Sequence, residues 1–169
     1  MSGASQTLEK GVAYIVPADS AAQLTKADSL AIISIRLPGE GDVSKAKLFA
    51  SVADFQALVA AGKNDPLVSL PPLRDMFQYR KEPQNALVHT QDDEFVYIAD
   101  GTGTFTMGGA LVDPKPTTPG NSGGSGITGG TQYKVAPGAV IFVPANTAHG
   151  FSDISGVLIS IDLHLPHAN

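Results

Sequence analysis

The sequence predicts an all-β domain, an antiparallel sandwich or barrel, with one helix in its N-terminal half. Six short apolar runs in the second half, each ending in turn residues, indicate strands at close spacing. A single segment at 51–63 carries helix signals at both ends. The 169 residues suit one domain with a sizeable core. The six runs are ALVHT, EFVYIADG, GTFTMGGALV, TQYKVAPG, AVIFVPA and VLISIDLHL.

The first part of the chain contains weaker strand signals. The β-branched runs at 12–16 and 30–37 are bounded by Asp, Ser, Pro and Gly, as buried strands often are. Between them, 18–26 is long enough for one or two helical turns. Prolines at 66, 71 and 72 then interrupt the chain before an extended run at 76–80.

The helix is expected over about 51–62. Ser51 and Asp54 form a capping pair at its start, and Gly62 ends it. Its apolar face is expected to consist of Val52, Phe55, Leu58 and Val59.

These elements divide the chain into an N-terminal extension at 1–80, packed on the barrel, and a barrel core at 81–169. Within the core, 113–131 is rich in Gly, Pro and Ser and has almost no apolar residue, so it is expected to be a flexible loop. The loop is either a lid over a binding site or a mobile segment without a function.

Composition narrows the function classes. The net charge of -5 and the lack of a basic run argue against nucleic acid and anionic lipid as partners. The sequence shows neither a membrane-spanning apolar run nor a signal-peptide pattern, so a cytoplasmic protein is expected. Without cysteine, any metal must be held by nitrogen and oxygen ligands.

Two stretches carry candidate ligands. In LVHTQDDEFVYIADGTG, strand alternation places Leu87 and His89 on one face, and Glu94 begins the next strand after a four-residue connection. In a hairpin, His89 and Glu94 can face the same interior, although both also suit a solvated turn. In GAVIFVPANTAHGFSD, His149 follows an apolar strand and the Pro144 turn, where a lone histidine is usually structural.

Together the two stretches resemble the signature motifs of the cupin superfamily, G(X)5HXH(X)3-4E(X)6G and G(X)5PXG(X)2H(X)3N. His89, Glu94 and Gly101 fall on the second histidine, the glutamate and the final glycine of the first motif. Three further residues match the second motif, namely Gly138, Pro144 and His149. The departures are Lys81 for the leading glycine, Leu87 for the first histidine, Asn146 for the second-motif glycine and Asp153 for the final asparagine.

The resemblance implies a small jelly-roll barrel, a homodimer and a divalent metal such as Fe, Mn or Zn. Because Leu87 cannot coordinate, the implied ligands are His89, Glu94 and His149, which leave positions open for water, substrate or dioxygen. A shifted register would make His89 and Gln91 the first ligand pair. Without a metal, Glu94 is expected to have a raised pKa and to act as a general acid or base.

Other residues are weaker candidates for a substrate pocket. Ser160, Asp162 and His164 share one face of the last strand, which points either to solvent or a subunit interface, or into the pocket. Gln78 and Arg80 lie either on the surface or at the barrel mouth, where they would meet an anionic substrate. The aromatic residues Phe142 and Phe151 suit the core as well as a pocket.

Two functions follow from the resemblance. The first is a metal-dependent enzyme of oxygenase, lyase or isomerase type, acting on a small organic substrate, carboxylated or phenolic. The second is a small-molecule-binding or sensing protein with a degenerate metal site, which the aliphatic Leu87 favours.

Overall fold

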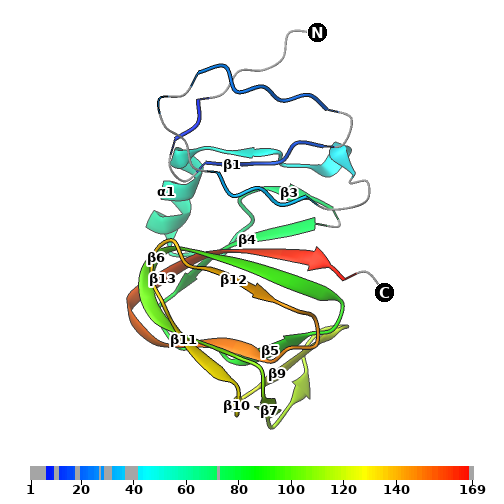
Figure 1. Cartoon of the computed structure of the whole chain (residues 1–169), viewed down its shortest axis with the longest axis vertical. Coiled ribbons are helices and arrows are strands. Elements are labelled where there is room, and N and C mark those ends of the chain that lie inside the picture. The colour runs from blue at the N-terminus through cyan, green and yellow to red at the C-terminus, as the bar shows by residue number, and fades with distance from the viewer. Residues whose placement is uncertain are drawn as a thin grey trace.

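The computed structural model describes residues 7–9, 12–17, 20–26, 28, 32–36, 42–71 and 73–167. They form a mainly antiparallel β structure in which a large sheet curls into a barrel beneath an N-terminal layer (Figure 1). None of the described helices is long and apolar enough to cross a membrane. In chain order the elements are β1 (Ala13–Tyr14), the 3-10 helix η1 (Val43–Lys45), β2 (Phe49–Ala50), α1 (Val52–Ala61), β3 (Ser69–Leu70), β4 (Leu73–Arg80), β5 (Ala86–His89), β6 (Asp92–Met107), β7 (Ala110–Val112), β8 (Lys115–Pro116), β9 (Asn121–Gly124), β10 (Gly126–Thr128), β11 (Thr131–Val135), β12 (Val140–Val143) and β13 (His149–Pro166).

The barrel is built around a ribbon of two long strands, β6 and β13, which pair antiparallel from end to end. Along its other edge β6 pairs with β11 and β12. The other partners of β13 are β4 and β5. Register shifts between Ser152 and Ser160 lie where the ribbon curls, at the left of Figure 1. These irregularities let the strands bend enough to close the barrel.

Gly101 lies in this curl, opposite the irregular part of β13. Its φ is +81°, and a Cβ built on it would lie 2.0 Å from the carbonyl oxygen of Val157. Only glycine fits both the backbone conformation and the close approach of the neighbouring strand. This requirement explains the glycine that ends the first motif.

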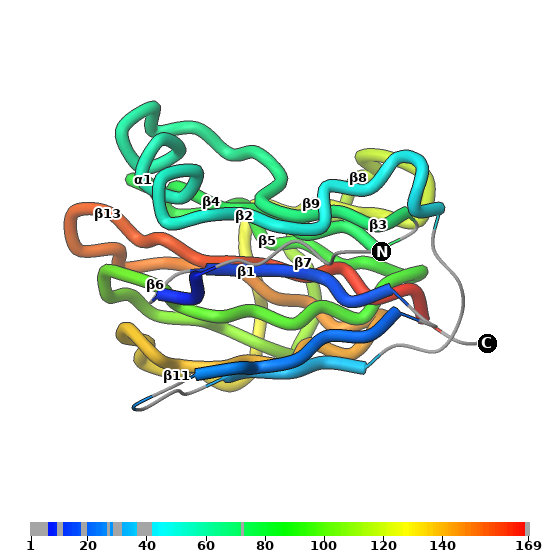
Figure 2. Tube along the Cα trace, turned by 90° about the horizontal axis from the view of Figure 1, so that it is seen from above, coloured from blue at the N-terminus to red at the C-terminus, as the bar shows by residue number. Residues whose placement is uncertain are grey.

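The large sheet packs on both faces. The barrel interior contains an apolar cluster made of Val96, Ile98, Phe105, Val135, Val143, Phe151 and Leu158. On the outer face of β4 and β13, the N-terminal layer forms a second cluster around Ala50, Leu67, Val68, Phe77 and Ile159. Figure 2, viewed from above, shows this layer crossing over the sheet. The N-terminal extension thus covers the outside of the barrel and leaves its interior to residues of the core.

Helix α1 forms as the sequence predicts. The Ser51 side chain accepts from the Asp54 amide, and the Asp54 side chain accepts from the Ser51 amide at 2.8 Å, which completes a capping box. Gly62 ends the helix in the left-handed conformation. Phe55, on the apolar face, packs edge-on against Phe77 of β4 with ring centroids 5.3 Å apart.

Other parts of the extension differ from the prediction. The strand expected at 12–16 is limited to Ala13–Tyr14, and the described residues 20–26 and 32–36 form neither helix nor strand. The remaining residues of the runs at 18–26 and 30–37 lie outside the described part of the chain. Ile32 and Ile33 are more than half exposed, so this run lacks the burial that would stabilise a strand. The 1–80 boundary also divides the sheet, because β4 pairs with β13.

Residues 113–131, expected to be a flexible loop, contain three short strands. β9 pairs with β5, β8 pairs with β9, and β10 pairs with β7. These strands show no alternating apolar pattern in the sequence, because they contain glycines, a serine and a proline, with Ile127 as their one large aliphatic residue. The pairing of β9 with β5 places the β8–β9 hairpin beside His89, since His89 is the register partner of Asn121.

Candidate metal centre

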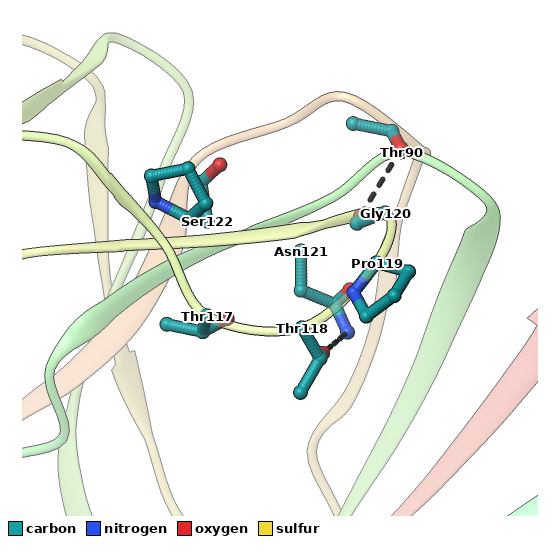
Figure 3. A pocket seen from close by; sticks show the side chains of 8 residues that line it. Thr90, Thr117, Thr118, Pro119, Gly120, Asn121 and Ser122 are labelled. Atoms are coloured by element: carbon teal, nitrogen blue, oxygen red, sulfur yellow. Dashed lines mark hydrogen bonds between the residues drawn. The ribbon is translucent and has the colours of Figure 1, made fainter.

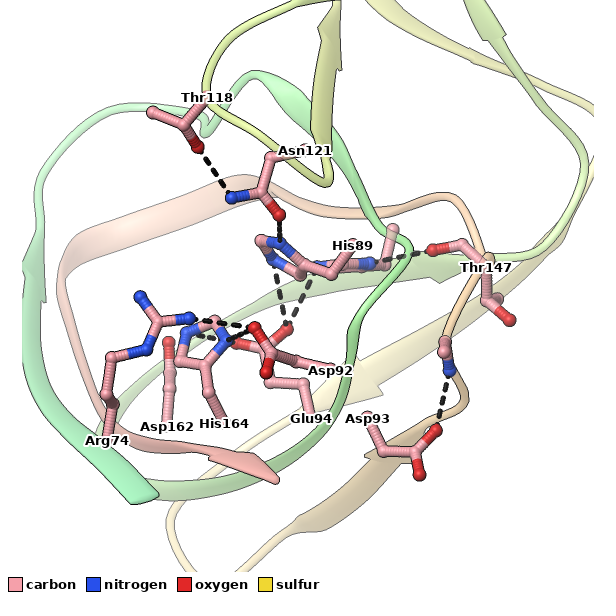
Figure 4. Close-up of polar contacts among 12 residues, drawn as sticks. Arg74, His89, Asp92, Asp93, Glu94, Thr118, Asn121, Thr147, Asp162 and His164 are labelled. Carbon is pink, nitrogen blue, oxygen red and sulfur yellow. Dashed lines mark hydrogen bonds and ion pairs between the residues drawn. The ribbon is translucent and has the colours of Figure 1, made fainter. Parts of the chain in front are cut away.

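Four ionisable side chains meet inside the barrel. His89 ends β5 and Glu94 lies near the start of β6, while His149 begins β13 and His164 lies near its end. The curl of the ribbon brings the two ends of β13 together, and His164 is the cross-strand partner of Glu94. Figure 4 shows His89 and His164 turned toward the Glu94 carboxylate.

The distances define a compact cluster around this carboxylate. His149 Nε2 lies 2.9 Å from Glu94 Oε2, and His89 Nε2 lies 4.0 Å from the same oxygen. His164 Nε2 lies 4.0 Å from the other oxygen, Oε1. One ligand atom each from His89, Glu94 and His164 lies within 4.8 Å of the other two. All three imidazoles therefore present Nε2 to one carboxylate.

Neighbouring oxygens fix the orientation of two of the imidazoles. His89 Nδ1 lies 2.7 Å from Asn121 Oδ1, and His149 Nδ1 lies 2.9 Å from the Thr147 carbonyl. Because these oxygens only accept, each Nδ1 donates its proton to them. Such outer partners hold a ring so that Nε2 can bind a metal. Asn121 comes from the β8–β9 hairpin, so the segment predicted to be a loop supports the site directly.

Electrostatics within the cluster are set by competition between burial and charge. Burial acts to raise the pKa of Glu94, but the contact with His149 and the other two imidazoles outweighs it and lowers that pKa. Burial opposes protonation of His149, but Glu94 dominates and raises the pKa of His149. The pKa of His164 is lowered, chiefly by burial.

These shifts give the side chains different roles. Glu94 stays a carboxylate, so the expectation of a raised pKa for Glu94 was wrong: three histidines surround it where an apolar wall was assumed. A carboxylate with a lowered pKa suits a ligand better than a proton donor. His164 is held neutral, which is the form that coordinates.

The donor set fits a divalent metal. Three imidazole nitrogens and one carboxylate suit Fe, Mn or Zn, and none of these metals requires a thiolate ligand. The chain has four histidines, and three of them are in this cluster. The fourth, His167, lies outside it, where Nδ1 contacts both Asp93 oxygens at 3.1 Å.

Leu87 lies where the motif resemblance places its first histidine. It pairs directly with His149 across β5 and β13, on the strand face shared with His89. In place of an imidazole from β5, the site gains His164 from β13. The His89, Glu94 and His149 prediction therefore names three of the four residues that the structure brings together.

The polar face of β13 points into the barrel. Ser160 is fully buried, Asp162 is 1% exposed, and His164 is mostly buried, so a solvent or subunit-interface face is ruled out. Arg80 Nη2 lies 2.8 Å from Asp162 Oδ2, and Arg80 Nη1 donates to Ser160 Oγ at 2.6 Å. Burial raises the pKa of Asp162, and Arg80 opposes that change.

The other pocket candidates are dispersed. Arg80 is buried in this pair with its guanidinium 4.9 Å from the Phe151 ring centroid, so it does not reach a substrate at the mouth. Phe151 belongs to the barrel core, Gln78 is half-buried and Gln91 is exposed. Phe142 is 51% exposed and points away from the interior, so it was wrongly assigned to the pocket. It alternates with Val143, which is the inward residue on β12.

The motif residues have the conformations that their positions require. Gly101 and Asn146, which replaces the second-motif glycine, both have positive φ, and the motif ligands His89, Glu94 and His149 all line the interior. The predicted antiparallel β-barrel is confirmed. The prediction and the structure agree in the antiparallel strand pairing and in the inward position of His89, Glu94 and His149.

No family model and no curated protein matches the sequence. Solved structures with a similar fold include a Bacillus halodurans protein that is 17% identical with a TM-score of 0.42; the match covers 57% of this chain and 64% of that one, less than two thirds of its length. A cupin superfamily protein from Desulfitobacterium hafniense is 12% identical with a TM-score of 0.44, covering 62% of this chain and 77% of that one. KdgF from Halomonas sp. is 16% identical with a TM-score of 0.45, covering 62% and 80%.

Proposed function

We propose that the protein is a metal-dependent enzyme that acts on a small organic substrate, by oxygenase, lyase or isomerase chemistry. The observation that carries this proposal is the convergence of three imidazole Nε2 atoms on one buried carboxylate. Such a cluster is costly to bury unless its charges are paired or coordinate an ion. If a divalent ion is bound there, it would act as a Lewis acid, able to polarise a substrate oxygen or to activate dioxygen.

The side chains of this site would have separate tasks. His89, His149, His164 and Glu94 hold the ion, and the oxygens of Asn121 and Thr147 keep two rings oriented. Without an ion, Glu94 and His149 form a pair at 2.9 Å that keeps the carboxylate ionised, and His149 must release its Nε2 proton before it can coordinate.

Metal analysis of protein purified without chelators tests the proposal. The wild type should carry about one divalent ion per chain, because four nitrogen and oxygen donors suffice for one site. His89→Ala combined with His149→Ala should remove the ion. His164→Ala alone should weaken binding by at least about tenfold. The control is His167→Ala, which changes a histidine outside the cluster and should bind as the wild type does.

Wild-type protein that holds no more metal than the double variant would overturn the proposal. If metal binds but His164→Ala binds it as tightly as the wild type, the set of three ligands that includes His149 is correct and the fourth ligand is not.

A second candidate is a binding or sensing protein without turnover. The aliphatic Leu87 favours this reading because it cannot coordinate and stands where the motif resemblance places a metal-binding histidine. It predicts that small organic ligands raise the Tm of the metal-free protein while no product forms with the metal-loaded protein.

A further inference from the structure

We propose that a surface cleft beside His89 binds a neutral, polyhydroxylated part of the substrate. The cleft has a volume of about 530 Å³ and lies between Thr90 and the β8–β9 hairpin (Figure 3). This inference rests on the proposed function, for which it supplies a substrate class. The lining residues are Thr90, Pro116, Thr117, Thr118, Pro119, Gly120, Asn121 and Ser122.

The chemistry of the lining selects the ligand. Four side chains carry hydroxyl groups, all of which can accept hydrogen bonds. All except Thr90, whose proton goes to the Gly120 carbonyl, can also donate, and the side-chain amide of Asn121 does both with separate atoms. Two proline rings add flat apolar surface. None of the eight lining residues is charged. A charged ligand would therefore lose water without gaining a counter-ion, whereas a neutral polyol exchanges its water hydrogen bonds for equivalent ones.

The cleft wall is held in place by its own hydrogen bonds. The Thr90 amide donates to the Gly120 carbonyl at 2.7 Å, and the Thr90 hydroxyl donates to the same oxygen at 3.1 Å. Within the hairpin, the backbone N–H of Asn121 donates to the Thr118 carbonyl at 2.9 Å. A wall that is already ordered needs little further ordering when a ligand binds.

Gly120 allows this arrangement. Its φ is +78°, and a Cβ on it would lie 2.8 Å from the Gln91 side chain. Glycine here lets the hairpin approach the connection between β5 and β6, so the cleft floor lies next to the strand that ends at His89.

Asn121 connects the cleft to the candidate metal centre. Its Oδ1 accepts from His89 Nδ1 at 2.7 Å, and its Nδ2 donates to Thr118 Oγ1 at 2.7 Å. Thr118 Oγ1 thus acts as an acceptor toward Asn121 and keeps its own proton to donate to a ligand. A polyol bound to Thr118 Oγ1 would be linked to His89 through three hydrogen bonds, by way of Thr118 and Asn121.

Titration of 15N-labelled full-length protein with myo-inositol tests this inference by amide chemical shifts. Shifts confined to Thr90 and to the non-proline lining residues 117, 118 and 120–122 are expected, at concentrations up to about 100 mM. Thr117→Val combined with Ser122→Ala should weaken binding by roughly tenfold, because two neutral hydrogen bonds are lost. Thr102→Val, an exposed threonine outside the cleft, is the matched control and should bind as the wild type does.

Three results would overturn the inference: no shifts with myo-inositol, equal shifts with cyclohexanol, or tighter binding of gluconate than of myo-inositol. Metal content is measured on the same samples. If metal-loaded protein does not bind myo-inositol, the polyol-binding role of the cleft is refuted and the metal proposal stands. If the protein binds myo-inositol but takes up no metal, the metal proposal is refuted and the polyol-binding role stands.

Discussion

Replacing Asp75 with asparagine should make the protein more stable at neutral and alkaline pH. Asp75 is 1% exposed on the outer face of β4, where the Val68 amide donates to Oδ2 at 3.3 Å and Oδ1 has no hydrogen-bond partner among the described residues. Burial raises the pKa of Asp75 to about 7, Asp162 adds to the increase, and the Val68 amide and Lys47 oppose it. Asparagine keeps an acceptor for Val68 and has no charge to bury.

The size of the effect follows from the linkage between protonation and folding. The unfolded chain releases the Asp75 proton near its ordinary pKa of 3.8, whereas the folded protein keeps it until about 7. Between these values the folded state binds more protons, so the free energy of unfolding falls as pH rises, by about 1.4 kcal/mol per pH unit. The total is roughly 4 kcal/mol, lost by pH 7 and above.

Urea unfolding at several pH values from about 4 to about 8 measures this contribution. The difference in free energy of unfolding between Asp75→Asn and the wild type should grow in favour of the variant across that range. Asp65→Asn, an exposed aspartate before the same sheet, controls for unrelated charge effects. A difference that does not change with pH would refute the reasoning, because it would mean that Asp75 titrates alike in both states.

Two further substitutions test the barrel interior and the ribbon. Arg80→Met should destabilise the protein by about 3–5 kcal/mol in thermal or urea unfolding, because Asp162 loses its buried cation. Adding Asp162→Leu to this variant should recover much of the lost stability, because no unpaired charge is then buried. If the double variant is no more stable than Arg80→Met, the broken ion pair is not the cause of the loss. Gly101→Ala should lower the free energy of unfolding by at least about 2 kcal/mol, a fall in Tm of roughly 4 °C or more. Gly156→Ala has a similar φ of +73° but open space, so an equal loss there would contradict the proposed overlap with Val157.

Much of the fold was predictable from local patterns. Capping residues and an apolar face defined α1, and alternating apolar runs defined the strands of the core, because both signals depend on neighbours in sequence. The short strands β8, β9 and β10 gave no such signal. They form because β5 and β7 offer free edges, which depends on the tertiary arrangement and not on the composition of residues 113–131.

The candidate metal centre was predictable only in part. Motif spacing located His89, Glu94 and His149, since their separation along the chain is fixed. Alternation placed His164 on one face with Asp162, but whether that face points inward depends on how β13 curls. Polar side chains usually face solvent, so the sequence alone favoured an outward direction for this face of β13. The homodimer and the cytoplasmic location stay predictions.

The curl of the β6–β13 ribbon makes the spacing of residues 153–156 a determinant of what the barrel can hold. His149 precedes this segment and His164 follows it on the same 18-residue strand. Side chains of a strand alternate between its faces, so removing one residue from the segment would exchange the two faces of everything after it. His164, Asp162 and Ser160 would turn outward against the N-terminal layer, and isoleucines 159 and 161 would fill the interior. A single-residue change in length would thus replace the polar cluster inside the barrel with aliphatic side chains, although every candidate ligand would still be present in the sequence.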